Sequence, residues 1–171
     1  MQRDTLIIIG LTLVAAVIGV SLFFYGPGGL ANVWSSAGAG DTAAVEVPFT
    51  ELARGYTSTV PERVNYLITS ASQLGELWKM TDATGMPPAV NFNTHAVIAV
   101  FAGQQPTAGY SIEVSKVGDA TVRMVTITFT KPGDGCILAQ MVTAPYELIS
   151  VPVGTLPLTH EEISTAVDCT I

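Results

Sequence analysis

The stretch HAVIAVFAGQQPTAGYSIEV, residues 95–114, determines our prediction of the fold. Its first part, His95 to Ala102, is an almost continuous apolar run of strand length, which is typical of a central strand buried on both faces. From Tyr110 to Val117, apolar and polar residues alternate instead, which indicates a strand with only one buried face. A loop with Pro106 and Gly109 separates the two strands. The stretch therefore predicts a β-rich domain.

The residues around this stretch continue the same pattern. Gly118 and Asp119 form a turn after the second strand, and Thr121 to Thr130 resumes the alternation, which predicts an antiparallel hairpin. The later segment ILAQMVTAPYELISVPV, residues 137–153, predicts one or two closing strands interrupted by Pro145.

Upstream, residues 49–56 and 63–69 are strand candidates, and a short helix is expected to follow them. Ser70 and Gln73 have the spacing of a capping box, while Leu74, Leu77 and Trp78 share one helical face. These elements total about six strands and one helix. We expect an α+β, mainly β domain, built as a small antiparallel sheet or sandwich.

The N-terminal segment differs in composition from this domain. Residues 6–25, LIIIGLTLVAAVIGVSLFFY, carry no charge and are long enough to cross a hydrocarbon core of about 30 Å. We expect residues 1–25 to form a single-pass transmembrane anchor, residues 26–47 a flexible Gly/Ala/Ser linker, and residues 48–171 the domain. A cleaved signal peptide is the alternative, with Ala37-Gly38-Ala39 as its site. Its apolar region would usually span only about 7–15 residues.

The charged residues and the cysteines indicate on which side of the membrane the domain lies and which partners it is expected to bind. After the apolar segment no Lys or Arg occurs before Arg54, which favours a cytoplasmic N-terminus and an extracytoplasmic domain. The formal net charge of −7 argues against nucleic acid as a partner. In an oxidising compartment, Cys136 and Cys169 are expected to form a disulfide closing a loop of about 34 residues. Two separate buried thiols remain the alternative.

No residues with the spacing of a known catalytic, metal or cofactor site are found. His95 begins an apolar strand, where a structural role is the usual one. The sequence His160-Glu161-Glu162 lacks the second His of a zinc-binding helix, so we expect a solvated charged turn. Gly133-Asp134-Gly135 lacks the further ligands of a calcium or phosphate loop and is expected to be a plain turn. We therefore expect no enzyme, no metal and no cofactor.

The order VIAVFAGQQPTAGYSIEV, KPGDGC, QMVTAPYELISVP resembles the PrcB C-terminal domain family, named after a subunit of a bacterial surface protease complex. The resemblance covers roughly residues 63–153, and its most specific parts are the P-T-x-G-Y-S-I core and the later T-x-P-Y. It implies an extracytoplasmic β-rich domain without activity of its own, which in some members stabilises or assembles a protease. The implied partner is a protein, with a protease as the expected kind, and the implied location is a prokaryotic envelope.

The loop before the second strand also resembles the N-P-T-T-G-Y loop of chagasin-like cysteine protease inhibitors. By position, this resemblance implies partner-binding loops that contain Gln105, Pro106, Thr107, Gly109 and Tyr110, with Gly133 and Gly135 in a second loop and Pro145 and Tyr146 in a third. Two departures stand against inhibition. Gln105 replaces Asn, and Ala144-Pro145-Tyr146 replaces Arg-Pro-Trp.

Two functions therefore stay open. The first is a membrane-tethered interaction domain that stabilises, assembles or inhibits a protease. The alternative is a cell-envelope structural or sensing domain that binds envelope polymer or another anchored protein. A packing role for Tyr110, with the loop only forming a corner of the fold, also remains possible at this stage.

Overall fold

The computed structural model describes residues 44–169 of the 171-residue chain. The chain divides into two units, Met1–Thr42 and Ala43–Ile171, and the structure described here is that of the second. The predicted anchor, residues 1–25, and most of the predicted linker lie outside the described residues. Among the residues that are described, no helix is long and apolar enough to cross a membrane.

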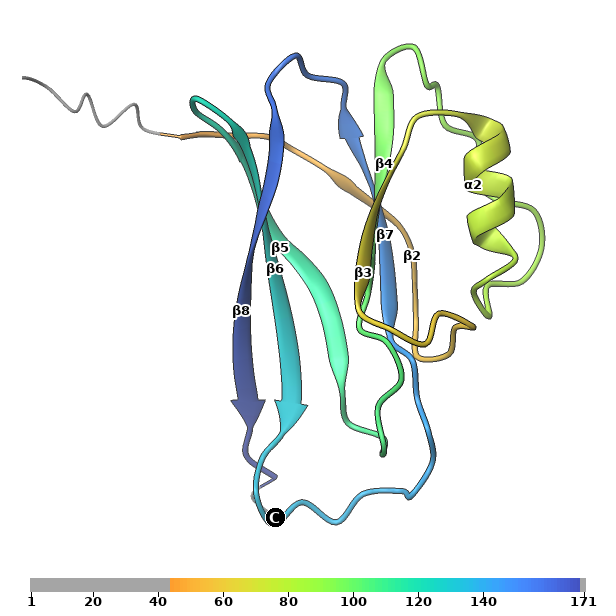
Figure 1. The fold of residues 1–171 in the computed structure, drawn as a ribbon, viewed down its shortest axis with the longest axis vertical. Helices are drawn as coiled ribbons and strands as arrows, with labels where there is room; N and C mark the ends of the chain where they lie inside the picture. The colour runs from red at the N-terminus through yellow and green to blue at the C-terminus, as the bar shows by residue number, and fades with distance from the viewer. Residues whose placement is uncertain (1–43, 170–171) are drawn as a thin grey trace, which may run out of the picture. The chain divides into compact units, whose positions relative to one another are not determined.

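Two four-stranded sheets and one helix make up the described domain (Figure 1). One sheet has the order β1-β5-β6-β8 and the other the order β2-β7-β4-β3. The elements are β1 (Val45–Glu46), β2 (Thr50–Gly55), β3 (Val64–Ile68), α2 (Ala71–Trp78), β4 (His95–Phe101), β5 (Ser111–Asp119), β6 (Arg123–Pro132), β7 (Tyr146–Pro152) and β8 (Leu158–Val167). The prediction of a mainly β fold with one short helix is confirmed.

β4 is the central strand that its apolar run predicts, since it lies between β3 and β7. Its alternate residues enter two different cores. Ile98 and Val100 face the other sheet, whereas Val97, Ala99 and Phe101 face α2. The domain therefore has three layers, with the β2-β7-β4-β3 sheet in the middle and α2 covering its outer face (Figure 1).

The hairpin prediction is confirmed by antiparallel β5 and β6, but Gly118 and Asp119 belong to β5 and the turn lies at residues 120–122. A register shift between Val114 and Lys116 shows a bulge in β5, which leaves Ser115 as the extra residue. Their inward side chains, among them Ile112, Val117 and Ile127, fill the space between the two sheets.

The sequence patterns did not predict β1 or β8. β1 lies within residues 26–47, the segment expected to be a flexible linker, and pairs with β5. Residues 158–167 pair in parallel with β6 over its full length. His160, Glu161 and Glu162 lie within this strand, so the expectation of a solvated turn there is wrong. The described residues contain eight strands rather than six, and one of the six strand pairings is parallel.

α2 begins as its sequence predicts. The Ser70 hydroxyl accepts a hydrogen bond from the Gln73 N–H at 3.3 Å. The Gln73 side-chain oxygen accepts one from the Thr69 N–H at 2.9 Å, one residue earlier than in a standard capping box. Leu74 and Leu77 are buried against the middle sheet. The cap fixes the helix start, and the two leucines fix which face it buries.

The connection from β6 to β7 has no strand before Tyr146. One strand follows Pro145, and residues 133–145 form an extended loop with a single bridge between Gln105 and Thr143. Gly133-Asp134-Gly135 forms the expected turn, in which Gly135 has a φ of 87°. The predicted disulfide between Cys136 and Cys169 is present and joins this loop to the residues after β8.

Candidate partner-binding surface

One end of the sandwich gathers the loop segments that the sequence singles out. β2 and β4 end there, at Gly55 and Phe101, while β5 and β7 begin there, at Ser111 and Tyr146. We call this surface the loop end and define it by Tyr56, residues 102–110 and residues 133–145. Figure 1 shows it at the bottom of the domain. β1 pairs with the opposite end of β5, at Gly118 and Asp119, so the first described strand lies at the far end.

Backbone hydrogen bonds hold the loop segments together. Gln105 and Thr143 exchange two of them, at 2.7 and 3.0 Å. The Thr143 hydroxyl also donates to the Thr107 carbonyl at 3.0 Å. The Ala144 N–H donates to the Tyr56 carbonyl at 2.8 Å, which adds the third segment. The loop end is thus a tied unit, as expected of a surface whose shape is fixed before it meets a partner.

Tyr110 is a packing residue rather than a presented one. Its ring stacks on Phe129 with centroids 5.9 Å apart and planes at 25°, and it is partly buried against the inter-sheet core. Gly109 has a φ of 90°, a conformation that favours glycine, and a Cβ there would lie 3.2 Å from the Leu138 side chain. The packing role of Tyr110, which the sequence left open, is therefore the one that the structure has. Gly109 and Tyr110 form a corner of the fold rather than an exposed loop.

Pro145 and Tyr146 are also buried, which corrects the expectation that they form a third presented loop. The ring of Tyr146 stacks near Phe101, with centroids 5.9 Å apart. Its hydroxyl donates to the Asp82 carboxylate at 2.8 Å. Burial, followed by the hydrogen bond to Asp82, raises the pKa of Tyr146 to about 12. The phenol therefore keeps its proton and its hydrogen bond at any physiological pH.

Four large apolar side chains of the loop end are exposed, and they are Tyr56, Ile137, Met141 and Val142. The sequence did not predict their exposure. Gln104, Pro106 and Gly109 are exposed beside them, whereas Gln105 and Thr107 are half-buried. Residues 137–142 were expected to belong to a strand, but they form none, so their apolar side chains have no sheet face to bury. Clustered exposed apolar residues are characteristic of a surface that contacts another protein.

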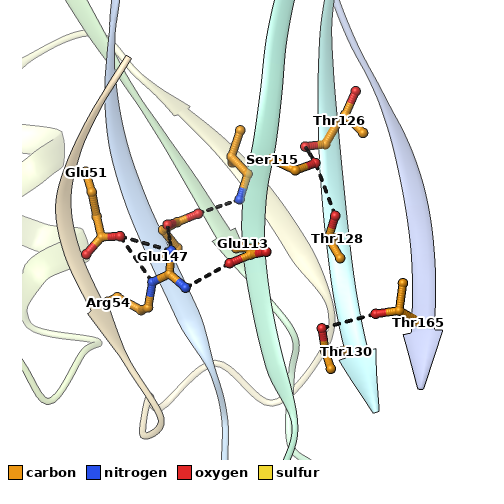
Figure 2. Close-up of polar contacts among 10 residues, drawn as sticks. Glu51, Arg54, Glu113, Ser115, Thr126, Thr128, Thr130, Glu147 and Thr165 are labelled. Carbon is orange, nitrogen blue, oxygen red and sulfur yellow. Dashed lines mark hydrogen bonds and ion pairs between the residues drawn. The ribbon is translucent and has the colours of Figure 1, made fainter. Parts of the chain in front are cut away.

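An ion-pair cluster lies just inside the loop end and joins three of its strands (Figure 2). Glu147 of β7 faces the other sheet and is almost fully buried. One of its oxygens binds the Arg54 guanidinium of β2 at 2.5 Å, and the other accepts the Val114 N–H beside the β5 bulge. Arg54 also binds Glu113 of β5 and Glu51 of its own strand, each at 3.0 Å. The cluster fixes the spacing between the strands that carry the loops.

The charges in this cluster are shifted by their surroundings. Burial raises the pKa of Glu147, against the opposing effects of the Val114 N–H and the Arg54 charge. Burial alone would lower the pKa of Arg54, but its bond to Glu113 and the charges of Glu147 and Glu51 raise it overall. Both shifts therefore have structural explanations in the packing of these strands.

The other candidate residues for chemistry are dispersed. The Nδ1 atom of His95 lies 2.9 Å from the Thr94 hydroxyl, and His160 lies on β8. Within residues 44–169, no group of three or more His, Cys, Asp or Glu side chains has the geometry to hold a metal ion.

The comparisons with known proteins bear on this same part of the chain. No curated protein and no solved structure matches it. A protein-family model described as PrcB C-terminal matches residues 96–152, a segment that begins in β4, contains residues 102–110 and 133–145, and ends with β7. The resemblance stated from the motifs is thereby confirmed over residues 96–152.

Proposed function

We propose that this chain is a non-catalytic interaction protein whose loop end binds a protein partner, a component of a protease complex. The observation that carries the proposal is the exposure of four large apolar side chains on the loop end, Tyr56, Ile137, Met141 and Val142. The family match supports the same region, since it contains three of these four residues. Its name supplies the protease complex as the partner class.

The tied backbone of the loop end favours binding over catalysis. A surface held by hydrogen bonds between three segments loses little conformational entropy when it docks, which favours affinity. Large apolar side chains near the centre of an interface commonly supply most of the binding energy. Stabilising or assembling a partner requires only such a surface, and it needs no nucleophile or metal.

We also propose that residues 1–25 anchor the chain in the membrane and that the domain is extracytoplasmic. Support comes from the uncharged segment 6–25 and from the absence of Lys and Arg between it and Arg54. Removing residues 1–25 should move the protein from the membrane fraction to the soluble fraction. Retention in the membrane fraction after a carbonate wash would contradict the anchor.

A matched pair of valines tests the loop end. Val142 lies on it and is 65% exposed, whereas Val153 lies beyond the opposite end of β7 and is 55% exposed. Tagged full-length chain, Val142→Lys and Val153→Lys are each purified from membranes, and the co-purifying proteins are identified. We expect wild type and Val153→Lys to retain a protease or protease subunit, and Val142→Lys to lose it by about tenfold or more. Equal recovery by both variants would contradict the loop end as the site.

The alternative, an envelope-binding domain, has one observation in its favour. Ser115, Thr126, Thr128, Thr130 and Thr165 place hydroxyl groups on the face of the β1-β5-β6-β8 sheet away from the core (Figure 2). Hydroxyls both donate and accept hydrogen bonds, as sugar polymers require. Co-sedimentation with purified cell-wall polymer, lost in the double variant Thr128→Val and Thr130→Val, would favour this function.

A further inference from the structure

The free edges of the two sheets are protected to very different degrees. The sheet orders leave β1, β8, β2 and β3 at the edges. β1 has only two residues, and β2 carries Glu51, Arg54 and a register shift. β8 points His160 and Glu162 toward the space between the sheets, on the same face as Val125 and Ile127. Short strands, bulges and inward-pointing charged residues are the usual protection against pairing with another chain.

β3 has none of these protections. Its sequence, VNYLI, contains no charged residue, and it pairs with β4 without a register shift. Tyr66 and Leu67 are both exposed on it. In a sheet edge, the backbone N–H and C=O groups of alternate residues point outward without a strand partner. β3 therefore offers a hydrogen-bonding edge between apolar side chains.

A cleft lies on each side of this edge. Leu67 and Asn65 face the other sheet and line a cleft of about 540 Å³, whose floor is Ile98, Val125 and Ile127. Tyr66 and Ile68 face α2 and line a second cleft of about 370 Å³ together with Leu77 and Met80. Successive side chains of a strand point to opposite faces, so a strand added beside β3 would direct alternate side chains into the two clefts.

The first cleft also contains polar groups. Arg63 and Glu162 form an ion pair of 2.8 Å across it, and the Arg63 guanidinium lies 3.9 Å from the centre of the Phe129 ring. The Asn65 side-chain oxygen is buried without a hydrogen-bond partner, one of two such side-chain atoms in residues 44–169. The second cleft is bounded mainly by apolar side chains. The two clefts therefore suit different side chains, small or polar in the first and apolar in the second.

We propose that the free edge of β3 binds an extended segment of a partner protein by strand addition. The segment forms main-chain hydrogen bonds with β3, places apolar residues in the cleft beside α2, and places small or polar residues in the cleft between the sheets. This site is separate from the loop end, since neither cleft is lined by residues 102–110 or 133–145. It follows from the free edge and the two clefts and does not depend on the proposed function.

A displayed library of random peptides of about seven residues, the length of a typical strand, provides the probe. It is selected on the purified full chain, and binding of the enriched peptides is measured on wild type, Leu67→Lys and Ile163→Lys. Leu67 on β3 is 51% exposed and Ile163 on β8 is 47% exposed, so the two substitutions are matched in exposure and in the charge they introduce. A synthetic copy of the best peptide, N-methylated at alternate residues, tests the main-chain bonds on unaltered protein.

We expect enriched peptides to carry apolar residues at every second position. Leu67→Lys and alternate N-methylation in one of the two registers should each weaken binding by about tenfold or more, while Ile163→Lys leaves it unchanged. Three outcomes overturn the proposal. They are a failure to enrich any peptide, binding that tolerates N-methylation in both registers, and a wild-type dimer that Leu67→Lys converts to a monomer, which would make the occupant a second copy of this chain.

Discussion

Two arginine–carboxylate clusters fasten the opposite ends of the sandwich, and they are built in opposite ways. At the loop end the carboxylate is the buried partner, since the Glu147 side chain is 2% exposed and that of Arg54 is 36% exposed. At the other end the arginine is the buried partner, since the Arg123 side chain is 9% exposed and that of Asp119 is 27% exposed. Arg123 binds both carboxylate oxygens of Asp119, at 2.7 and 2.8 Å, and donates to the Pro152 carbonyl.

The difference shows that the buried partner decides how a cluster responds to change. A buried carboxylate has lost water and depends on its protein partners, so burial raises the pKa of Glu147. Asp119 keeps part of its water and gains the Arg123 donors, so that hydrogen bond lowers the pKa of Asp119. Losing Glu147, the more deeply buried of the two buried partners, should therefore cost more than losing Arg123, and acid should affect the two ends with opposite sign.

The largest effect is expected from Glu147→Ala. The substitution leaves the Val114 N–H without its acceptor and leaves Arg54 in a cluster that has lost its buried anion. Breaking a buried pair from one side typically costs about 3–5 kcal/mol of unfolding free energy, and the partial exposure of Arg54 places this case near 3 kcal/mol. Denaturant unfolding of wild type and variant measures it.

Glu147→Gln is the matched control, because an amide oxygen can still accept the Val114 N–H. We expect it to cost clearly less than Glu147→Ala. A loss below about 1 kcal/mol for Glu147→Ala would show that the cluster contributes little to the fold.

Arg123→Ala should have a smaller effect, of about 2 kcal/mol. The Pro152 carbonyl loses a donor, but Asp119 is exposed enough to regain water. A cavity also forms where the arginine stem packs. Lys79→Ala serves as the control, since the Lys79–Glu76 pair is largely exposed and should contribute less than about 0.5 kcal/mol. A larger loss of unfolding free energy for Arg123→Ala than for Glu147→Ala would contradict the expected order of the two ends.

The smallest effects are the pH dependences, which should have opposite signs. The pKa of Glu147 is raised in the fold, so its contribution is fully present below about 4.5 and is lost as pH rises through the folded value. The pKa of Asp119 is lowered, so its contribution is present above about 3.8 and is lost as pH falls through the folded value. Unfolding free energies of wild type, Glu147→Gln and Asp119→Asn are compared across the acid range.

The wild-type advantage over Glu147→Gln should shrink as pH rises, and the advantage over Asp119→Asn should shrink as pH falls. If both differences in unfolding free energy changed in the same direction with pH, the identity of the buried partner would not determine the sign of the pH dependence.

Local patterns predicted the elements whose stability is local. β4 was predicted because all of its inner positions are apolar, and the β5–β6 hairpin because its turn and alternation are adjacent in sequence. β8 was not, because His160 and Glu162 occupy the inward positions that apolar residues fill in an ordinary strand. Its pairing is parallel and non-local, and the partner of Glu162, Arg63, is 99 residues away in sequence.

The candidate site was predicted in part. The motif containing Pro106 and Gly109 does lie at the loop end, but its Tyr110 and the Tyr146 of the later T-x-P-Y motif face inward. A motif specifies residue types, and it does not show which side of the backbone they take. Glu147 offered a signal that went unused, since a single carboxylate inside an apolar strand requires a buried partner.

The disulfide has a mechanical consequence for a domain held at one end and pulled at the other. Cys136 and Cys169 are 33 residues apart in sequence, and β7 and β8 lie between them. A pulling force that enters at Cys169 passes through the bond to Cys136 and bypasses the enclosed chain. Roughly 115 Å of potential extension is thereby withheld, at about 3.5 Å per residue. Under tension, β7 and β8 would stay inside a covalent ring while the rest of the domain unravels around it.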